Sequence, residues 1–170
     1  MTLPKIIVIA ALSADGFISR GRGLPWQLPA DQAFFRQVLA AHDWVLVGAE
    51  TFAEMQGCFA ARQRVLVLGR RGLPAWAGPQ QQRVTSMGQA LDEVRAGAGS
   101  QLLCIGGAQT YAAALPLAVE LRLTRVELRL GQGLAFPALD EGWRLHSSRA
   151  HLADAQHAHA MKFEHWIRET

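Results

Sequence analysis

The 170-residue sequence has few cysteines, few lysines and no apolar segment long enough to cross a membrane. Cys58 and Cys104 are too few for a disulfide framework and lack the spacing of a zinc or paired-thiol site, so we expect a protein of the reducing cytoplasm. The N-terminal apolar run, Ile6 to Leu12, is short, and Asp15 and Gly16 follow it closely. We interpret this run as a first core strand rather than a signal segment, and we expect no association with a membrane.

The sequence also lacks the clustered basic residues of a nucleic-acid-binding surface. Its lysines are Lys5 and Lys162, so nearly all of the 17 basic residues are arginines, and the formal net charge is +3. Arginine captures carboxylate and phosphate groups through paired hydrogen bonds, which favours a small anionic ligand over nucleic acid. There is no GxGxxG fingerprint, Walker motif or nucleophile elbow.

Length and composition predict a single domain over residues 1–170, because a chain of this size with 50% hydrophobic residues can bury one sizeable core. Apolar runs alternate with helical patterns and then give way to strand patterns alone, which predicts an α/β fold with a mainly parallel sheet, helices on both faces and an antiparallel C-terminal edge. The expected strands are Ile6–Leu12, Trp44–Val47, Arg64–Leu68, Gln101–Ile105, Leu121–Leu130, Trp143–Ser148 and Met161–Arg168, with a brief strand at Val84. The expected helices are Ala30–Ala41, one capped by Thr51 and running through Met55, one capped by Ser86, and one opened by Gly106-Gly107 and stopped by Pro116.

The stretch from Leu24 to Phe35 contains a candidate for an acid catalyst. Two prolines around a tryptophan indicate a stiff extended loop that leads into a helix. Asp31 precedes Phe34, Phe35 and Val38 by three, four and seven residues, so its carboxylate falls on the apolar face of that helix. Burial there would raise the pKa of Asp31 toward the range of a general acid. The spacing alone leaves open a second interpretation, in which Asp31 caps the first turn and faces water.

Gly106 and Gly107 follow an apolar strand and precede a helix, an arrangement that lets the backbone approach a phosphate closely. In isolation the same pair is also a common tight turn. Histidines gather in the C-terminal part of the chain, at His151, His157, His159 and His165. No cysteine or HExxH partner accompanies them, so we favour exposed strand and loop positions and expect no metal.

Together these motifs resemble the dihydrofolate reductase family, from about Ile6 to Ile167. Each motif is weak alone, and the resemblance depends on their order and spacing. The motifs are Ile9-Ala10-Ala11, the run from Leu24 to Asp31, Val47-Gly48 with Thr51-Phe52, Arg62 before a strand, Ile105-Gly106-Gly107 with Tyr111, Leu123-Thr124, and Phe136-Pro137. The resemblance implies a monomer with a mostly parallel eight-stranded sheet flanked by helices. It also implies NADPH-dependent reduction of 7,8-dihydrofolate, with hydride added at C6 and a proton at N5, and it makes antifolate inhibitors candidate ligands.

The resemblance further implies roles for individual residues. Asp31 would hold the pterin and promote protonation of N5, Thr124 would orient Asp31, and Trp26 would hold an ordered water. The implied catalytic set is Asp31, Trp26, Thr124 and Leu24. The implied substrate-binding set is Ile9, Ala11, Asp31, Gln32, Phe35, Met55, Phe59, Arg62, Ile105 and Thr124, with Arg62 pairing with the glutamate tail. The implied cofactor-binding set is Ala11, Ile18, Gly48, Ala49, Thr51, Leu68, Gly69, Arg70, Ile105, Gly106, Gly107, Ala108, Gln109, Thr110 and Tyr111. A cis bond is implied between Gly106 and Gly107, and a closing lid over residues 13–23.

The sequence departs from the family at the cofactor phosphate. Ala49 and then Glu50 stand where the family often has an arginine that meets the 2′-phosphate, so we expect Arg70 or Arg71 to supply that contact.

Two alternatives remain open. The segments Ser13-Ala14-Asp15-Gly16 and Val47-Gly48-Ala49 also resemble pterin or riboflavin-pathway pyrimidine reductases of the same fold. Such enzymes would not be expected to keep the run from Pro25 to Asp31 or Arg62. A non-catalytic folate- or nucleotide-binding module is the other alternative, and it would bind dihydrofolate without oxidising a cofactor.

Overall fold

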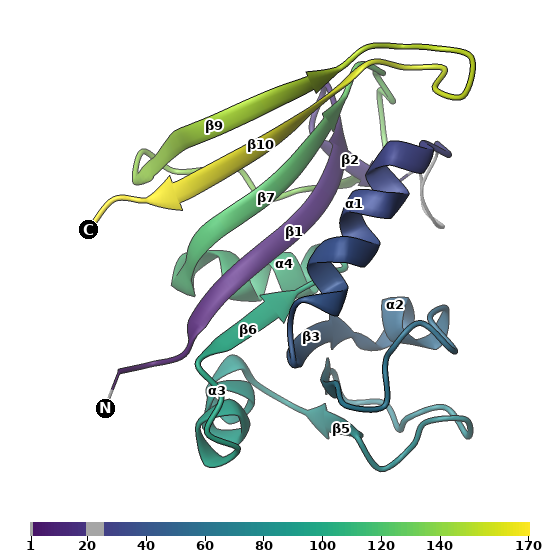
Figure 1. Ribbon diagram of the computed structural model, residues 1–170. Helices are drawn as coiled ribbons and strands as arrows, with labels where there is room; N and C mark the ends of the chain where they lie inside the picture. Colours follow the sequence, from purple (N-terminus) through teal and green to yellow (C-terminus); the bar gives the residue numbers. More distant parts are fainter. Residues whose placement is uncertain (1, 20–25) are drawn as a thin grey trace.

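The structure is a computed structural model that describes residues 2–19 and 26–170, and it is built on one eight-stranded sheet (Figure 1). The strands of this sheet are β1 (Lys5–Ser13), β3 (Trp44–Gly48), β4 (Arg64–Leu68), β5 (Gln81–Val84), β6 (Gln101–Cys104), β7 (Ala118–Val126), β9 (Trp143–His151) and β10 (Met161–Arg168). Their order is β5-β4-β3-β6-β1-β7-β10-β9. β10 runs antiparallel to its neighbours β7 and β9, whereas the other pairings in the sheet are parallel. The predicted fold class, including the antiparallel C-terminal edge, is confirmed.

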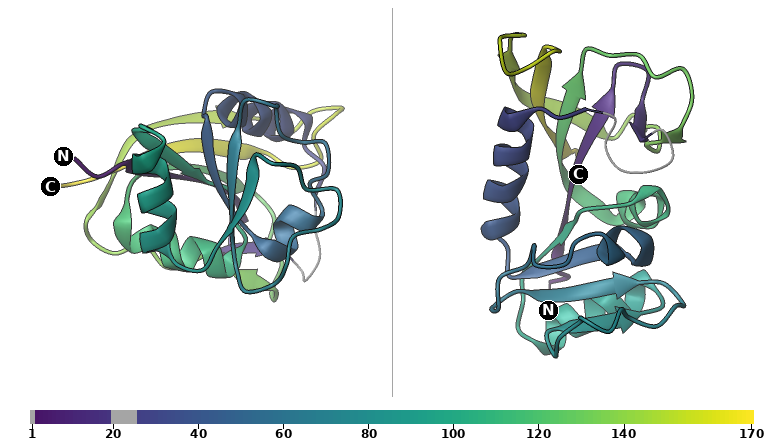
Figure 2. Two further views of the ribbon diagram at one scale, coloured as in Figure 1. Left: turned by 90° about the horizontal axis from the view of Figure 1, so that it is seen from below. Right: turned by 90° about the vertical axis from the view of Figure 1, so that its right-hand side faces the viewer.

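Helices cover both faces of the sheet, which explains why its central strands are apolar almost throughout. Alternate residues of β1 point to opposite faces. Ile6 and Val8 join the core layer that includes helices α3 (Met87–Ala96) and α4 (Ala108–Ala114). Ile7 and Ile9 join the layer under helices α1 (Pro29–Ala40) and α2 (Ala49–Ala53). Two further views show α1 on one side of the sheet and α3 and α4 on the other (Figure 2).

Local sequence signals set several helix ends. α1 begins at Pro29, whose missing N–H is tolerated at a first helical position. Ser86 caps α3 by accepting a hydrogen bond from the Gln89 N–H at 3.0 Å, as the capping-box pattern predicts. The predicted cap at Thr51 is wrong: α2 starts directly after Gly48 with no intervening loop, so Thr51 lies inside it. α4 ends at Ala114, one residue short of the predicted end, and a 3₁₀ turn, η1 (Leu115–Leu117), contains Pro116.

A second, two-stranded sheet joins two loops that are far apart in sequence. β2 (Phe17–Ser19) pairs antiparallel with β8 (Leu134–Ala135). Neither strand was expected, because each is too short to show a periodic pattern. The predicted strand Leu121–Leu130 is also displaced: β7 covers Ala118–Val126, and the chain then turns with a hydrogen bond from the Leu128 N–H to the Val126 carbonyl. Within the described residues, no helix is both long enough and apolar enough to cross a membrane.

Candidate active site

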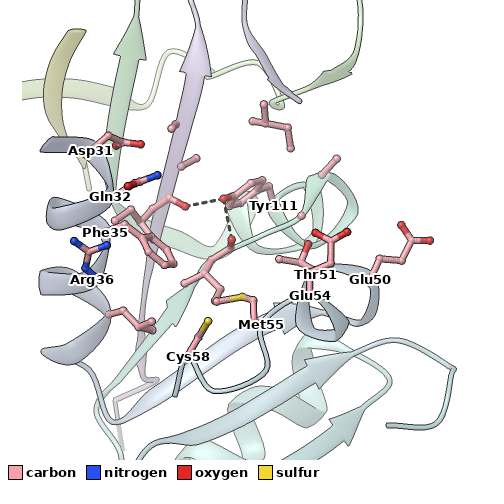
Figure 3. A pocket seen from close by; sticks show the side chains of 18 of the residues that line it. Asp31, Gln32, Phe35, Arg36, Glu50, Thr51, Glu54, Met55, Cys58 and Tyr111 are labelled. Atoms are coloured by element: carbon pink, nitrogen blue, oxygen red, sulfur yellow. Dashed lines mark hydrogen bonds between the residues drawn. The ribbon is translucent and has the colours of Figure 1, made fainter. Parts of the chain in front are cut away.

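A cavity of about 780 Å³ opens at the carboxyl ends of β1 and β6 (Figure 3). α1 forms one wall, and α2 with its following loop and the start of α4 form the other. Its volume and its place at the carboxyl ends of parallel strands are typical of a small-molecule site. The lining residues are Ile9, Ala10, Ala11, Ile18, Asp31, Gln32, Phe35, Arg36, Leu39, Glu50, Thr51, Glu54, Met55, Gly57, Cys58, Ile105, Gly107, Ala108, Tyr111 and Leu134.

Asp31 lies in the first turn of α1 and faces this cavity (Figure 3). Its residue is only 6% exposed, and Phe34, Phe35 and Val38 on the same helical face are half-buried against the core. Burial raises the pKa of Asp31 above the usual value for an aspartic acid, and a side-chain hydrogen bond with Thr124 lowers it only in part. The interpretation of Asp31 as a buried acid therefore holds, and the water-facing cap does not.

Thr124 and Trp26 are buried beside the cavity but are not part of its lining. Thr124 lies on β7 directly opposite Ala11 of β1, and this pairing brings its hydroxyl to Asp31. Trp26 belongs to an apolar cluster with Leu28 and Phe163, under the start of α1. Its buried indole N–H has no acceptor within the described residues. It is therefore free to donate a hydrogen bond to an ordered water.

The Gly106-Gly107 corner closes the other side of the cavity. The bond between them is cis, as expected, and the Gly106 carbonyl accepts a 2.6 Å hydrogen bond from the Gly48 N–H at the end of β3. Gly106 has φ +109°, and a Cβ there would lie 2.8 Å from the Tyr111 hydroxyl oxygen, so the corner has room only for glycine. The Tyr111 hydroxyl lies 2.8 Å from the Ile9 carbonyl oxygen and 3.0 Å from that of Ile105, and it ties the corner to β1. Burial raises the pKa of Tyr111 well above its usual value, so the phenol stays neutral.

The structure brings many of the implied ligand-binding residues into one cavity and leaves others outside its lining. Those that line it are Ile9, Ala11, Ile18, Asp31, Gln32, Phe35, Thr51, Met55, Ile105, Gly107, Ala108 and Tyr111. Those that do not are Trp26, Gly48, Ala49, Phe59, Arg62, Leu68, Gly69, Arg70, Gly106, Gln109, Thr110 and Thr124. Leu24, and the part of the expected lid over residues 20–23, lie outside the described residues.

Two of the residues outside the lining have other contacts. Phe59 stacks on Phe52 with ring centroids 5.9 Å apart. Arg62 is exposed and donates hydrogen bonds to the Asp43 carboxylate and the Ala40 carbonyl, beyond the cavity at the far end of α1.

Sequence reasoning missed several charged residues in the lining, including Arg36, Glu50 and Glu54. Arg36 lies four residues after Gln32 on α1, so helical spacing could have identified it. Glu54 is three residues after Thr51 and could have been found in the same way. Leu134 had no local signal, because it reaches the cavity only through the pairing of β8 with β2.

Fold and site together define an α/β protein with a cavity that suits a small organic ligand, at the carboxyl ends of its central strands and beside one buried carboxyl group. The family model described as dihydrofolate reductase matches residues 5–168. Dihydrofolate reductase from Neisseria meningitidis serogroup A is 30% identical over 164 residues, covering 96% of this chain and 98% of the relative. The enzyme from Mycobacterium tuberculosis is 34% identical over 143 residues, covering 81% and 83%.

The fold likeness is equally extensive. A solved structure of dihydrofolate reductase from Enterococcus faecalis, complexed with NADP(H) and RAB-propyl, superposes with a TM-score of 0.78 at 22% identity and covers 98% of this chain and 97% of that one. The chain belongs to the dihydrofolate reductase family and is an oxidoreductase of that family.

Proposed function

We propose that this enzyme reduces 7,8-dihydrofolate to 5,6,7,8-tetrahydrofolate with NADPH, adding hydride at C6 and a proton at N5, as a cytoplasmic monomer that supports one-carbon metabolism and thymidylate synthesis. The observation that carries this proposal is the buried carboxyl of Asp31, in the wall of a cavity whose opposite wall is the Gly106-Gly107 corner. The same cavity would be the site of antifolate inhibitors.

Asp31 is the proton-handling group of the proposed reaction. Its carboxylate would pair with the amino and ring N–H groups of the pterin, and its raised pKa suits a group that promotes proton delivery near neutral pH. Thr124 would fix the orientation of the carboxyl through their hydrogen bond. The buried indole N–H of Trp26 would hold the water that carries the proton to N5.

The residues around the glycine corner fit a nucleotide cofactor. A Cβ on Gly107 would lie 3.1 Å from the Thr51 hydroxyl oxygen, so the absence of a side chain keeps open the part of the cavity that Gly107, Thr51 and Ala108 share. NADPH, when bound, supplies the hydride. Ile18, from β2, and Tyr111 line the same cavity and would shield the reacting ring from water.

Arg70 and Arg71 are proposed to bind the 2′-phosphate of the cofactor. A Cβ on Gly69 would lie 3.2 Å from the Ala49 Cβ, so Gly69, just after β4, is directly beside the first residue of α2. Arg70 and Arg71 follow Gly69 in the chain and therefore lie near the start of α2. A lost charge-assisted contact should raise the KM for NADPH by roughly 10–100-fold in Arg70→Ala or Arg71→Ala. The KM for NADH, which has no 2′-phosphate, should not change and is the internal control. Equal use of both cofactors by the wild type, unchanged in both variants, would refute this assignment.

Arg62 is proposed to pair with the glutamate tail of the substrate, in competition with Asp43. Arg62→Ala should then raise the KM for dihydrofolate but not for dihydropteroate, which has no glutamate. An equal effect on both substrates would remove Arg62 from the site.

The first test of the function is the loss of NADPH absorbance on addition of dihydrofolate, with a pterin and a ribosylated aminopyrimidine as competing substrates. Turnover of dihydrofolate supports the proposal. Turnover of another substrate alone would indicate a pterin or riboflavin-pathway reductase, and binding of dihydrofolate without NADPH oxidation would indicate a non-catalytic module.

A further inference from the structure

A side chain from the other end of the sequence caps the helix that carries Asp31. Leu28, the residue before α1, forms no side-chain cap within the described residues, and Pro29 has no N–H to donate. The next N–H, that of Ala30, donates a 3.0 Å hydrogen bond to Nε2 of His157. The loop between β9 and β10 therefore satisfies a helix-terminal donor that would otherwise be left unpaired.

This hydrogen bond defines the tautomer of His157. Because Nε2 accepts, the ring proton lies on Nδ1, which donates to Asp154 Oδ1 at 2.8 Å. The hydrogen bond from His157 is the largest influence that lowers the pKa of Asp154, so this carboxylate stays ionised and holds the ring. The hairpin is stiffened further by hydrogen bonds from the Asp154 N–H to the His157 carbonyl at 3.0 Å and from the Gln156 N–H to Asp154 Oδ1 at 2.9 Å. His157 itself is 5% exposed.

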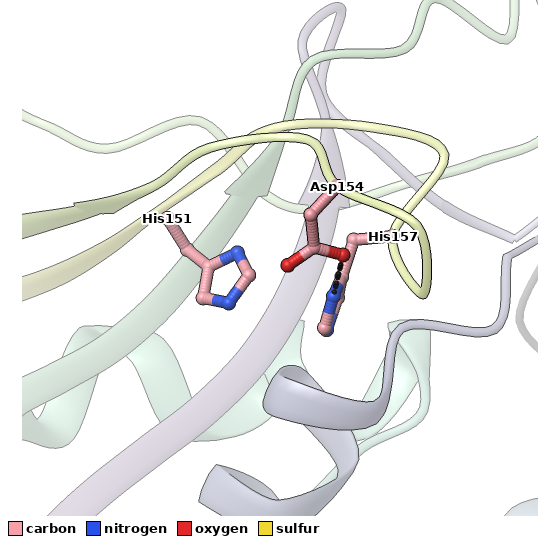
Figure 4. Close-up of side chains that lie close together, drawn as sticks. All are labelled: His151, Asp154 and His157. Atoms are coloured by element: carbon pink, nitrogen blue, oxygen red, sulfur yellow. Dashed lines mark hydrogen bonds and ion pairs between the residues drawn. The ribbon is translucent and has the colours of Figure 1, made fainter.

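His151, Asp154 and His157 also bring three possible metal ligands within 4.8 Å of one another (Figure 4). The hydrogen bonds favour a cap over a metal centre. Both ring nitrogens of His157 are already used, and turning either toward a metal would break its bond to Ala30 or to Asp154. His151 lies beside the ring, with centroids 4.3 Å apart, but its Nδ1 bonds to the Leu152 carbonyl at 2.9 Å.

We propose that His157, oriented by Asp154, is a positioning residue for Asp31. Asp31 follows Ala30 directly, so the hydrogen bond that fixes the Ala30 N–H also fixes the turn from which the carboxyl projects into the cavity. Without the cap, the first turn of α1 loosens and water reaches Asp31, which returns its pKa toward the usual value of a carboxylic acid. The effect on reaction rate rests on the function proposed above, whereas the effect on Asp31 itself does not.

Three variants test the cap. His157→Leu removes the acceptor, His157→Gln keeps an oxygen that can reach the Ala30 N–H, and His151→Gln is the matched control on the neighbouring ring. Amide exchange at Ala30 and the titration of the Asp31 carboxyl carbon, both followed by NMR, need no turnover. In His157→Leu we expect exchange about tenfold faster, a lower pKa for Asp31, and a pH–rate profile whose break moves down with that pKa. His157→Gln and His151→Gln should match the wild type.

Several results would overturn the proposal. One is an unchanged Asp31 titration in His157→Leu, even with faster exchange at Ala30. Another is zinc binding to the wild type at micromolar concentration that displaces the Ala30 bond and is abolished by His151→Gln. If His157→Leu does not fold, Asp154→Ala replaces it, because Asp154 is exposed and its loss frees the His157 ring. This variant should give faster exchange at Ala30 and a lower pKa for Asp31, both by less than in His157→Leu. An Asp154→Ala protein with neither change would contradict the proposal. If the wild type does not turn over dihydrofolate, but the variants still differ as expected in Ala30 exchange and Asp31 titration, the proposed function is refuted and the proposed cap is supported.

Discussion

Gly48→Ala should destabilise the protein by a purely steric route. Gly48 ends β3 with φ −72° and ψ 155°, a conformation that alanine adopts freely. A Cβ there would lie 2.7 Å from Thr110 Oγ1, whose residue is only 4% exposed, and 3.4 Å from the Gly107 nitrogen. Overpacking of this kind costs about 1–3 kcal/mol, and the lower entropy of the unfolded chain returns up to roughly 1 kcal/mol. We take a net loss near the middle of this range, about 1–2 kcal/mol, which at a urea slope of about 2 kcal/mol/M lowers the unfolding midpoint by about 0.5–1 M.

The double variant Gly48→Ala/Thr110→Ala is the matched control, because it removes the one atom that the new methyl group would strike. We expect it to recover at least half of the loss after correction for Thr110→Ala alone. The steric reasoning would be refuted if Gly48→Ala were as stable as the wild type. It would also be refuted if the stability loss of the double variant equalled the sum of the losses in Gly48→Ala and Thr110→Ala.

Three further predictions concern single polar groups. Tyr111→Phe removes the hydroxyl that bonds to the Ile9 carbonyl and should cost about 1–2 kcal/mol in urea unfolding; an unchanged midpoint would contradict this. The Ser13 hydroxyl and the backbone N–H of Leu130 lower the pKa of Asp15 to about 2. This stabilisation is complete above the unfolded pKa of about 4 and is lost as pH falls toward 2, so Asp15→Asn should lower the melting temperature at pH 6 and not near pH 2. Burial raises the pKa of Asp31, so the wild type loses stability as pH rises from the unfolded pKa through the raised folded pKa. Asp31→Asn carries no such charge and should melt higher than the wild type at pH 8 but not at pH 3.

The sequence was most informative where a pattern repeats along one element. Ile6 to Leu12 is apolar without interruption because side chains of β1 enter the core layers on both faces of the sheet, each of which is covered by helices. The three-, four- and seven-residue spacing of Asp31 to side chains on the same face of α1 indicated its burial, and the structure decided between that position and a water-facing cap. In both cases, the spacing of apolar side chains that predicts the strand or helix also indicates which of its residues are buried.

Contacts between distant segments left no such signal. The bond from Ala30 to His157 joins residues 127 positions apart, and β2 pairs with β8 across a similar gap. The expectation that the C-terminal histidines are exposed is wrong for His157, which is buried against α1, and nothing in the spacing of the histidines indicated this. Such contacts follow from the assembled sheet, which places the loop between β9 and β10 beside the start of α1, and single-residue patterns do not encode them.

The measurement that tests the central claim most directly is NADPH-dependent turnover of dihydrofolate by the wild type and Asp31→Asn across pH. If Asp31 handles the proton, the variant should be slower by roughly 10²–10⁴-fold at neutral pH. Its rate should recover in part at low pH or with a substrate that is already protonated. Equal rates for both proteins at every pH would contradict the role of Asp31, whatever the enzyme reduces.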